Sequence, residues 1–275
     1  MVSEIKRVSS GIKELDELLG GGFPTGHAIL LEKDSGSGGG LFSIYFLWNA
    51  LKEGKYACYF VTDKDPKLIE YRAKSIGTPL GEYMVGNPPK FVFIDGFHGG
   101  HLRAETKKEY PYTIEDLRDV SHIHDVFREV MMGWGHESAE IPVDKEIWDT
   151  RAVWSYDSIS TLIYYGGTEA LSLVAHQMAA QKKHEYTGLF VVENDSLPER
   201  VMRLLELWAD GIITLTTEKM TRFSEGVVDR EILNPLPTDT ETKNFLEIKK
   251  LRWFDNYHRG KVEYSYKEGK INIEI

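Results

Sequence analysis

The chain has a single cysteine, Cys58, among its 275 residues, and only two glutamines. One cysteine excludes an internal disulfide and any zinc site built from several cysteines, which is typical of intracellular proteins. Scarce glutamine beside abundant glutamate and lysine is typical of thermophilic proteins, including archaeal ones.

Long apolar runs are also missing. The most apolar stretch, 41–51, is too short to span a bilayer and contains Ser43 and Asn49. The first residues are charged and lack the apolar core of a signal peptide. We therefore expect a cytoplasmic protein that does not enter a membrane.

Positive charge is scarce: 33 Lys and Arg face 43 Asp and Glu, giving a net charge of −10. This balance excludes a general attraction to nucleic acids or anionic membranes. Residues 243–275 differ, with 8 basic and 5 acidic residues, so a nucleic-acid role would be confined to this part. Hydrophobic residues make up 41% of the chain, enough for a full core.

Short apolar runs alternate with helical patterns along most of the chain. The runs predict strands at 28–31, 56–62, 91–94, 152–156, 189–193 and 211–216, and the patterns between them predict helices at 12–19, 41–53, 66–76, 169–183 and 198–209. This alternation is typical of an α/β fold with a doubly wound, mostly parallel sheet flanked by helices. After it, a strand at 245–253 and a hairpin near 262–275 predict a β extension over about 245–275.

The segment from about 96 to 150 interrupts the alternation. It contains a helical stripe at 123–134 and five of the nine histidines, His98, His101, His122, His124 and His136. Their spacing matches no closed zinc framework, so we predict no metal site. We interpret the segment as an insertion that carries the surface for a protein partner.

A glycine-rich loop from Lys33 to Gly40 lies between a predicted strand and a predicted helix, which is the arrangement of a phosphate-binding loop. Such a loop needs backbone N–H groups around the phosphates, a lysine on the β and γ oxygens, and a Ser or Thr hydroxyl for magnesium. The run 36–38 supplies the backbone groups. Gly39 and Gly40 stand where the lysine and the hydroxyl should be.

The motifs around this loop resemble a known family. The lead-in over 11–26, with Leu-Asp-Glu-Leu-Leu-Gly-Gly-Gly-Phe-Pro at 15–24, is similar to that of the KaiC-like branch of RecA-superfamily ATPases. The resemblance continues at 151–160, ending near Asp157-Ser158, and at 209–215 and 248–252. It implies one RecA-like domain over 1–275, with the insertion and the β extension described above. A weaker resemblance, over 19–34, is to the Elongator subunit-four branch, whose RecA-like ring lacks the usual motifs and binds tRNA.

The resemblance also shows where this chain departs from the family. Asp63-Lys64 stands where the family has a pair of catalytic carboxylates, so one acidic group is missing. Asp157 matches the metal-side carboxylate, and Lys250 and Arg252 match bases that reach a neighbouring subunit's nucleotide. If the protein is active, Asp63 and Asp157 are the catalytic candidates. The nucleotide-binding candidates are Lys33, Ser35, Gly36, Ser37, Gly38, Gly39, Gly40, Lys250 and Arg252.

These departures favour a catalytically inactive KaiC-like protein that acts as an oligomeric regulatory or scaffold subunit, as a homo-oligomer or in a ring with related subunits. ATP is the one cofactor the resemblance implies, bound weakly and with little dependence on magnesium. Two alternatives stay open. The first is an atypical ATPase in which Lys33 supplies the missing ammonium. The second is a ring component that binds RNA or single-stranded DNA through the basic and aromatic residues of 249–261.

Overall fold

The computed structural model describes residues 6–101, 110–135, 152–228, 235–254, 257–258, 260–267 and 270–274. Within them, ten strands form one sheet in the order β12-β11-β10-β9-β3-β8-β7-β4-β5-β6. The strands are β3 (Ala28–Lys33), β4 (Ala57–Val61), β5 (Phe91–Asp95), β6 (Tyr112–Thr113), β7 (Val153–Asp157), β8 (Thr187–Glu193), β9 (Gly211–Val228), β10 (Pro235–Leu251), β11 (Lys261–Lys267) and β12 (Lys270–Ile273). Neighbours from β9 to β6 are parallel, and β9 through β12 pair antiparallel. The predicted mostly parallel sheet with a C-terminal hairpin is confirmed.

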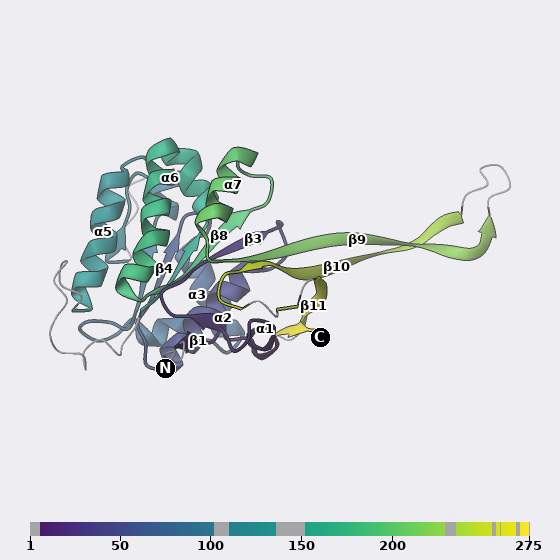
Figure 1. Ribbon diagram of the computed structural model, residues 1–275, viewed down its shortest axis with the longest axis horizontal. Helices are drawn as coiled ribbons and strands as arrows, with labels where there is room; N and C mark the ends of the chain where they lie inside the picture. Colours follow the sequence, from purple (N-terminus) through teal and green to yellow (C-terminus); the bar gives the residue numbers. More distant parts are fainter. Residues whose placement is uncertain are drawn as a thin grey trace.

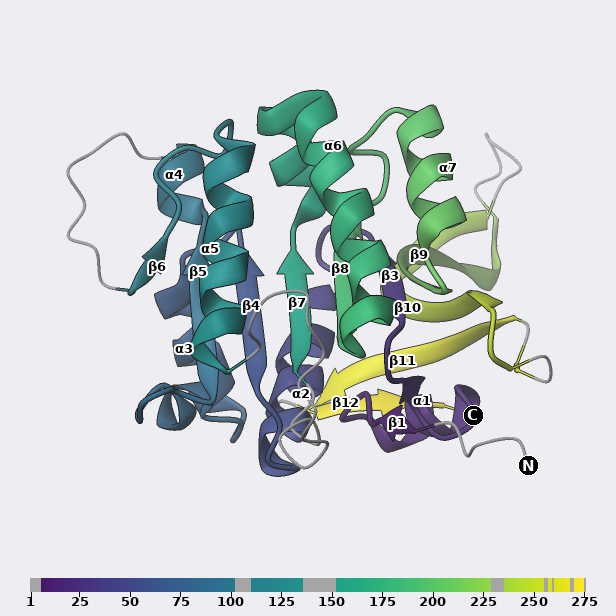
Figure 2. The same ribbon diagram turned by 60° about the vertical axis from the view of Figure 1, so that its left-hand side comes forward.

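Helices cover both faces of this sheet (Figures 1 and 2). One face packs against α2 (Gly39–Lys52), α3 (Pro66–Ser75), the 3-10 helix η1 (Leu80–Tyr83) and the β11–β12 hairpin, with α1 (Lys13–Leu18) nearby. The other face packs against α5 (Val120–Gly133), α6 (Ile159–His184) and α7 (Glu199–Trp208). The short elements are β1 (Arg7–Val8) and β2 (Phe23–Pro24), which pair with each other, and α4 (Phe97–His101). No helix of the described residues is long and apolar enough to cross a membrane.

Side chains of the central strands point alternately to the two faces of the sheet, so each strand contributes to the hydrophobic core on both faces. In β4, Tyr59 and Val61 point to the α2 side, whereas Cys58 and Phe60 point to the α6 side, and all four are buried. A strand buried on both faces appears in the sequence as a continuous apolar run. Because these strands are parallel, their carboxyl ends lie together at one end of the sheet, between the two packed cores. The candidate site lies at this end.

The described part of 96–150 belongs to the same sheet. β6 pairs with the end of β5, and α5 packs against α6. The α5 residues Ile123, Phe127 and Val130 are at most 2% exposed. This part of the segment therefore contributes to the core, while residues 102–109 and 136–150 lie outside the described part.

The largest difference from the expected elements is a long two-stranded ribbon. β9 and β10 run well beyond the predicted ranges 211–216 and 245–253, and their register continues to Pro235 opposite Val228. Figure 1 shows the ribbon projecting away from the body of the molecule. A second difference is α6, which begins at Ile159 rather than near 169. Gly167 has a non-helical backbone, so the pair Gly166-Gly167 forms a kink within this helical segment and does not mark its beginning.

Candidate functional site

The loop between β3 and α2 ends at Gly38, which has a left-handed backbone with φ of 79° and caps the helix. Ser37 is buried, and both its backbone N–H and its hydroxyl donate to the carbonyl of Asp34, at 3.2 and 2.8 Å. Ser35 and Gly36 are exposed at the tip. The first N–H groups of a helix have no partner within it, so α2 directs unused donors and a positive dipole end at this loop.

Asp34 fixes the loop to the neighbouring strand ends. Its Oδ1 accepts from Asn194 Nδ2 at 2.7 Å, just after β8, and its Oδ2 accepts from the backbone N–H of Thr217 in β9 at 2.8 Å. These contacts join three parts of the chain that lie about the same edge of the sheet. Asp34 is thus a structural anchor of the loop.

The C-terminal hairpin holds the loop from the opposite side. Tyr264 in β11 donates its hydroxyl to the carbonyl of Ser37 at 2.7 Å, and burial raises the pKa of Tyr264 to about 12. A Cβ atom added to Gly38 would lie 2.0 Å from the hydroxyl oxygen of Tyr266. Tyr266 therefore occupies the space that any side chain at position 38 would need.

Lys33, at the end of β3, lies where the sequence expects the side chain of residue 39. A Cβ atom on Gly39 would be 2.4 Å from Cδ of Lys33, so the aliphatic part of Lys33 crosses this glycine. Its ammonium is paired with the carboxylate of Glu193, at the end of β8, at 2.9 Å. The structure thus brings a lysine to the loop, but its charge is already matched by an acid of the same chain.

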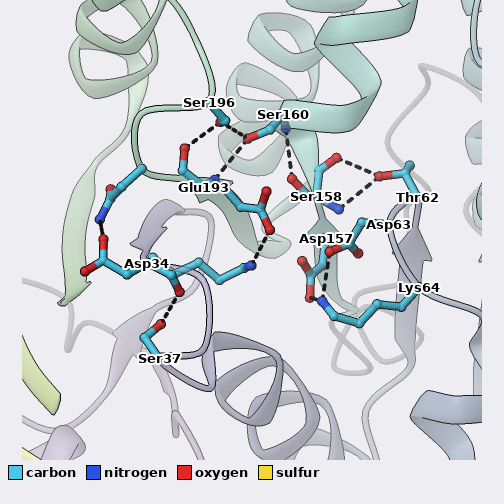
Figure 3. Close-up of polar contacts among 12 residues, drawn as sticks. Asp34, Ser37, Thr62, Asp63, Lys64, Asp157, Ser158, Ser160, Glu193 and Ser196 are labelled. Atoms are coloured by element: carbon cyan, nitrogen blue, oxygen red, sulfur yellow. Dashed lines mark hydrogen bonds and ion pairs between the residues drawn. The ribbon is translucent and has the colours of Figure 1, made fainter. Parts of the chain in front are cut away.

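Asp157, at the end of β7, faces the start of α2 and is 1% exposed. Its Oδ2 accepts from the Tyr59 hydroxyl at 3.0 Å and would lie 3.7 Å from a Cβ on Gly40. Burial raises the pKa of this carboxyl above its ordinary value. The peptide bond between Asp157 and Ser158 is cis, and Thr62 accepts the N–H of Ser158 and donates to its carbonyl (Figure 3).

Lys64 extends from the end of β4 toward two carboxylates (Figure 3). Its ammonium is 2.9 Å from Oδ2 of Asp63 and 3.8 Å from Oδ2 of Asp157. Burial alone would lower the pKa of Lys64, but the charges of Asp157 and Asp63 raise it above its ordinary value. The ammonium is therefore a fixed positive charge between the two acids that the resemblance marks as catalytic candidates.

A hollow of about 250 Å³ opens beside this group, lined by Gly40, Asp63, Lys64, Arg72 and Phe97 among others. It lies between the start of α2 and helix α3. A small anion or the end of a phosphate chain bound in the hollow would meet the bases Lys64 and Arg72. The carboxylate of Asp63 also lines the hollow and reduces its positive potential.

The structure keeps Lys250 and Arg252 apart from the loop. Lys250 donates to the carbonyls of Glu206 and Ala209 at 2.6 and 2.7 Å, and Arg252 donates to that of Leu207 at 2.7 Å. Both bases thus stabilise the C-terminal end of α7, where a helix accumulates negative partial charge.

The neighbouring residues of the basic and aromatic stretch also contact the body. Lys249 pairs with the buried carboxylate of Glu32 at 2.6 Å, and Trp253 packs edge-on against His27 with ring centres 5.3 Å apart. Phe254 covers Gly20. These side chains are held in intramolecular contacts, whereas base stacking on nucleic acid needs exposed aromatic faces. Asn256 and Arg259 lie outside the described residues.

Glu206 gives this region a pH dependence. Burial, and then the charge and hydrogen bond of Glu32, raise the pKa of Glu206, against the opposite effects of Lys249 and Lys250. The native state thus keeps this proton at pH values where the unfolded chain has lost it, and stability falls as pH rises through that interval. Glu206→Gln should raise the free energy of unfolding by on the order of 0.5 kcal/mol at neutral pH and leave it unchanged at acidic pH. The gain is small because exposed charges are screened.

Urea denaturation at several pH values measures this effect. Glu199→Gln, on the first turn of the same helix and paired with Arg203, is the matched control and should show no gain. An equal gain in both variants at neutral pH would attribute the effect to net charge and not to the Glu206–Glu32 contact.

Several residues of the site could not be identified from the sequence. Glu193 ends the predicted strand 189–193, and this position was the one indication of it in the sequence. That this strand lies beside β3 is seen only in the structure. Tyr59 and Tyr266 carried no signal, because each reaches the site from an apolar or alternating strand pattern that predicts only packing. Asp34 could have been read as a turn residue, but its bonds to Asn194 and Thr217 depend on strand order.

A strand, a glycine-rich loop, a helix and a buried acid at the end of another parallel strand of the same sheet are the arrangement of a RecA-type α/β domain. The family described as "ATPase: KaiC" matches residues 8–274. The chain belongs to this KaiC ATPase family.

Relatives and a solved structure agree with this assignment. A UPF0273 protein of Aeropyrum pernix is 23% identical to this chain, and the match covers 83% of this chain and 93% of that protein. The UPF0273 protein SSO1861 of Saccharolobus solfataricus is 27% identical over 83% of this chain and 74% of its own. The crystal structure of the KaiC-like protein PH0186 from Pyrococcus horikoshii has a TM-score of 0.69 at 19% identity, covering 99% of this chain and 100% of that one. The expected KaiC-like, RecA-type fold is confirmed.

The family implies ATP and a magnesium ion, and the residues at the loop do not fit the ion. Gly40 offers no hydroxyl beside Asp157, and the Lys64 ammonium lies between Asp63 and Asp157. In the described residues no group of three or more His, Cys, Asp or Glu side chains could hold a metal. Phosphate groups fit better, because the backbone donors of the loop and of α2 are retained.

Proposed function

We propose that this protein is a non-hydrolysing member of the KaiC ATPase family that acts as an oligomeric regulatory or scaffold subunit. It retains only weak nucleotide binding at the loop. One observation carries the proposal: among the described residues of this site, the ammonium groups of Lys33 and Lys64 are already paired with the carboxylates of Glu193 and Asp63.

Hydrolysis of ATP depends on the stabilisation of negative charge in the transition state. Phosphoryl transfer is catalysed mainly by cations and donors placed around the transferring group, and removal of one such group typically lowers the rate by about 10²–10³-fold. Position 39 lacks the loop lysine and position 40 lacks the metal-binding hydroxyl. Near the loop, the described ion-paired group Lys33, Asp63, Lys64, Asp157 and Glu193 contains two ammonium groups and three carboxylates. A cluster with this balance does not attract a triphosphate strongly.

The scaffold part of the proposal is supported by the β9–β10 ribbon. In the part of β10 before Asn244, where its register with β11 begins, the described residues pair with β9 alone. Two-stranded ribbons are marginally stable by themselves, so contact with a second subunit would stabilise this one. Light scattering tests this part: a monomer at every protein concentration would contradict it.

Hydrolysis and binding are measured separately. With ATP and magnesium we expect phosphate release at the level of a protein-free control, while an intact KaiC-like ATPase in the same assay turns over. Calorimetric titration of ATP should give weak binding that a chelator leaves unchanged. Magnesium-dependent phosphate release that disappears in Asp157→Ala would overturn the proposal and establish the atypical ATPase.

A further inference from the structure

Lys64 is the one basic residue of the described cluster that contacts both acids of the candidate site. Its Nζ lies 2.9 Å from Asp63 and 3.8 Å from Asp157, and these distances place one positive charge between two carboxylates (Figure 3). The resemblance puts a carboxylate, not a base, at this position. A cation therefore stands where the resemblance implies the second acid of a catalytic pair.

The carboxylates need such a charge. The side chain of Asp157 is 1% exposed and that of Asp63 is 18% exposed, and like charges that share a mostly buried place repel each other. Asp63 and Asp157 each keep a buried oxygen, Oδ1, without a hydrogen-bond donor in the described residues. Buried acceptors of this kind are costly unless a cation or a donor lies near.

We infer that the Lys64 ammonium is a built-in counter-cation that takes the place of a divalent metal ion between Asp63 and Asp157. This inference rests on the proposed function, in which the loop carries out no magnesium-dependent hydrolysis. The positive charge between these two acids is then supplied by the chain itself, and the conformation of the site does not depend on a metal. Any phosphate compound bound at the loop would be bound as the metal-free anion.

The inference is tested by removing the ammonium and offering the metal alone. Thermal unfolding of the wild type should be the same with millimolar Mg²⁺, with Mn²⁺ and with a chelator. Lys64→Met removes the positive charge between the two carboxylates, so their repulsion should make this variant less stable than the wild type in chelator. It should regain stability as Mn²⁺ is added. Calorimetry should show Mn²⁺ binding to this variant at least about tenfold tighter than to the wild type.

Two control variants keep the test decisive if Lys64→Met folds poorly. Lys64→Arg retains the charge and should stay indifferent to metal. The double variant Asp63→Asn with Lys64→Met removes one acid together with the base, so it should fold without metal and show little Mn²⁺ response. Equal Mn²⁺ stabilisation of wild type and Lys64→Met would overturn the inference, as would a Lys64→Met protein that is as stable as wild type and does not bind Mn²⁺.

The outcomes separate this inference from the proposed function. A wild type that neither hydrolyses ATP nor responds to metal, combined with a Lys64→Met variant that ignores Mn²⁺, would contradict the counter-cation alone. ATP hydrolysis by a wild type whose stability ignores metal would contradict the proposed function and leave the counter-cation intact. Hydrolysis together with metal stabilisation of the wild type would contradict both.

Discussion

Replacement of Phe127 by alanine is expected to destabilise the protein by about 3–5 kcal/mol, the usual cost of removing a buried aromatic ring. Phe127, on α5, is 2% exposed. The centre of its ring lies 5.1 Å from the ring centre of Phe60, 5.8 Å from that of Trp154 and 5.7 Å from that of Tyr156. From the sequence, the segment of about 96–150 is expected to be an insertion in the single domain that carries the surface for a protein partner. The packing of α5 shows that the described part of this segment supports β4, which Asp63 follows, and β7, which ends at Asp157.

Urea denaturation followed by circular dichroism measures this loss. Met132 on the same helix is 49% exposed, and Met132→Ala should change stability by no more than about 0.5 kcal/mol. If both variants lost the same small amount, α5 would be peripheral and the segment dispensable for folding.

The second large effect is expected at Gly38. An alanine there must adopt a left-handed backbone, at a cost of about 1–2 kcal/mol, and its Cβ would meet the Tyr266 hydroxyl at 2.0 Å. Displacement of a packed side chain adds about 1–3 kcal/mol. Gly38→Ala should therefore destabilise the protein well beyond the backbone cost.

Gly36 is the matched control for this prediction. Its φ is 85°, close to that of Gly38, but nothing lies within 4 Å of an added Cβ, so Gly36→Ala measures the backbone cost alone. In the background of Tyr266→Ala, the effect of Gly38→Ala should fall to that of Gly36→Ala, a coupling of about 1–3 kcal/mol. Equal losses for Gly36→Ala and Gly38→Ala in the wild type would show that the hairpin does not press on the loop.

The central sheet could be predicted from the sequence because strands buried on both faces leave continuous apolar runs between glycines. The ribbon could not. Beyond Thr216 the chain leaves the core, so no apolar periodicity marks it, and Pro235 and Pro237 argue against a strand. Their presence is accommodated because the register with β9 shifts around both of them.

The candidate site shows a similar division. The glycine loop could be found because it lies between a predicted strand and a predicted helix, and Asp157 could be found because its motif resembles that of the family. The ion pair of Lys33 with Glu193 joins residues 160 positions apart and depends on β3 lying beside β8. Lys64 was visible as a departure from the family pattern, but its place between two acids required the geometry of two strand ends.

The bond between the Tyr264 hydroxyl and the Ser37 carbonyl joins residues 227 positions apart. During synthesis the loop emerges from the ribosome long before β11 exists, so its final shape must wait for almost the whole chain. Contacts of such separation form late, because the entropy of closing the intervening chain is lost before they contribute. The strands and helices of the core can therefore assemble first, and the phosphate-type loop acquires its native form as one of the last steps of folding.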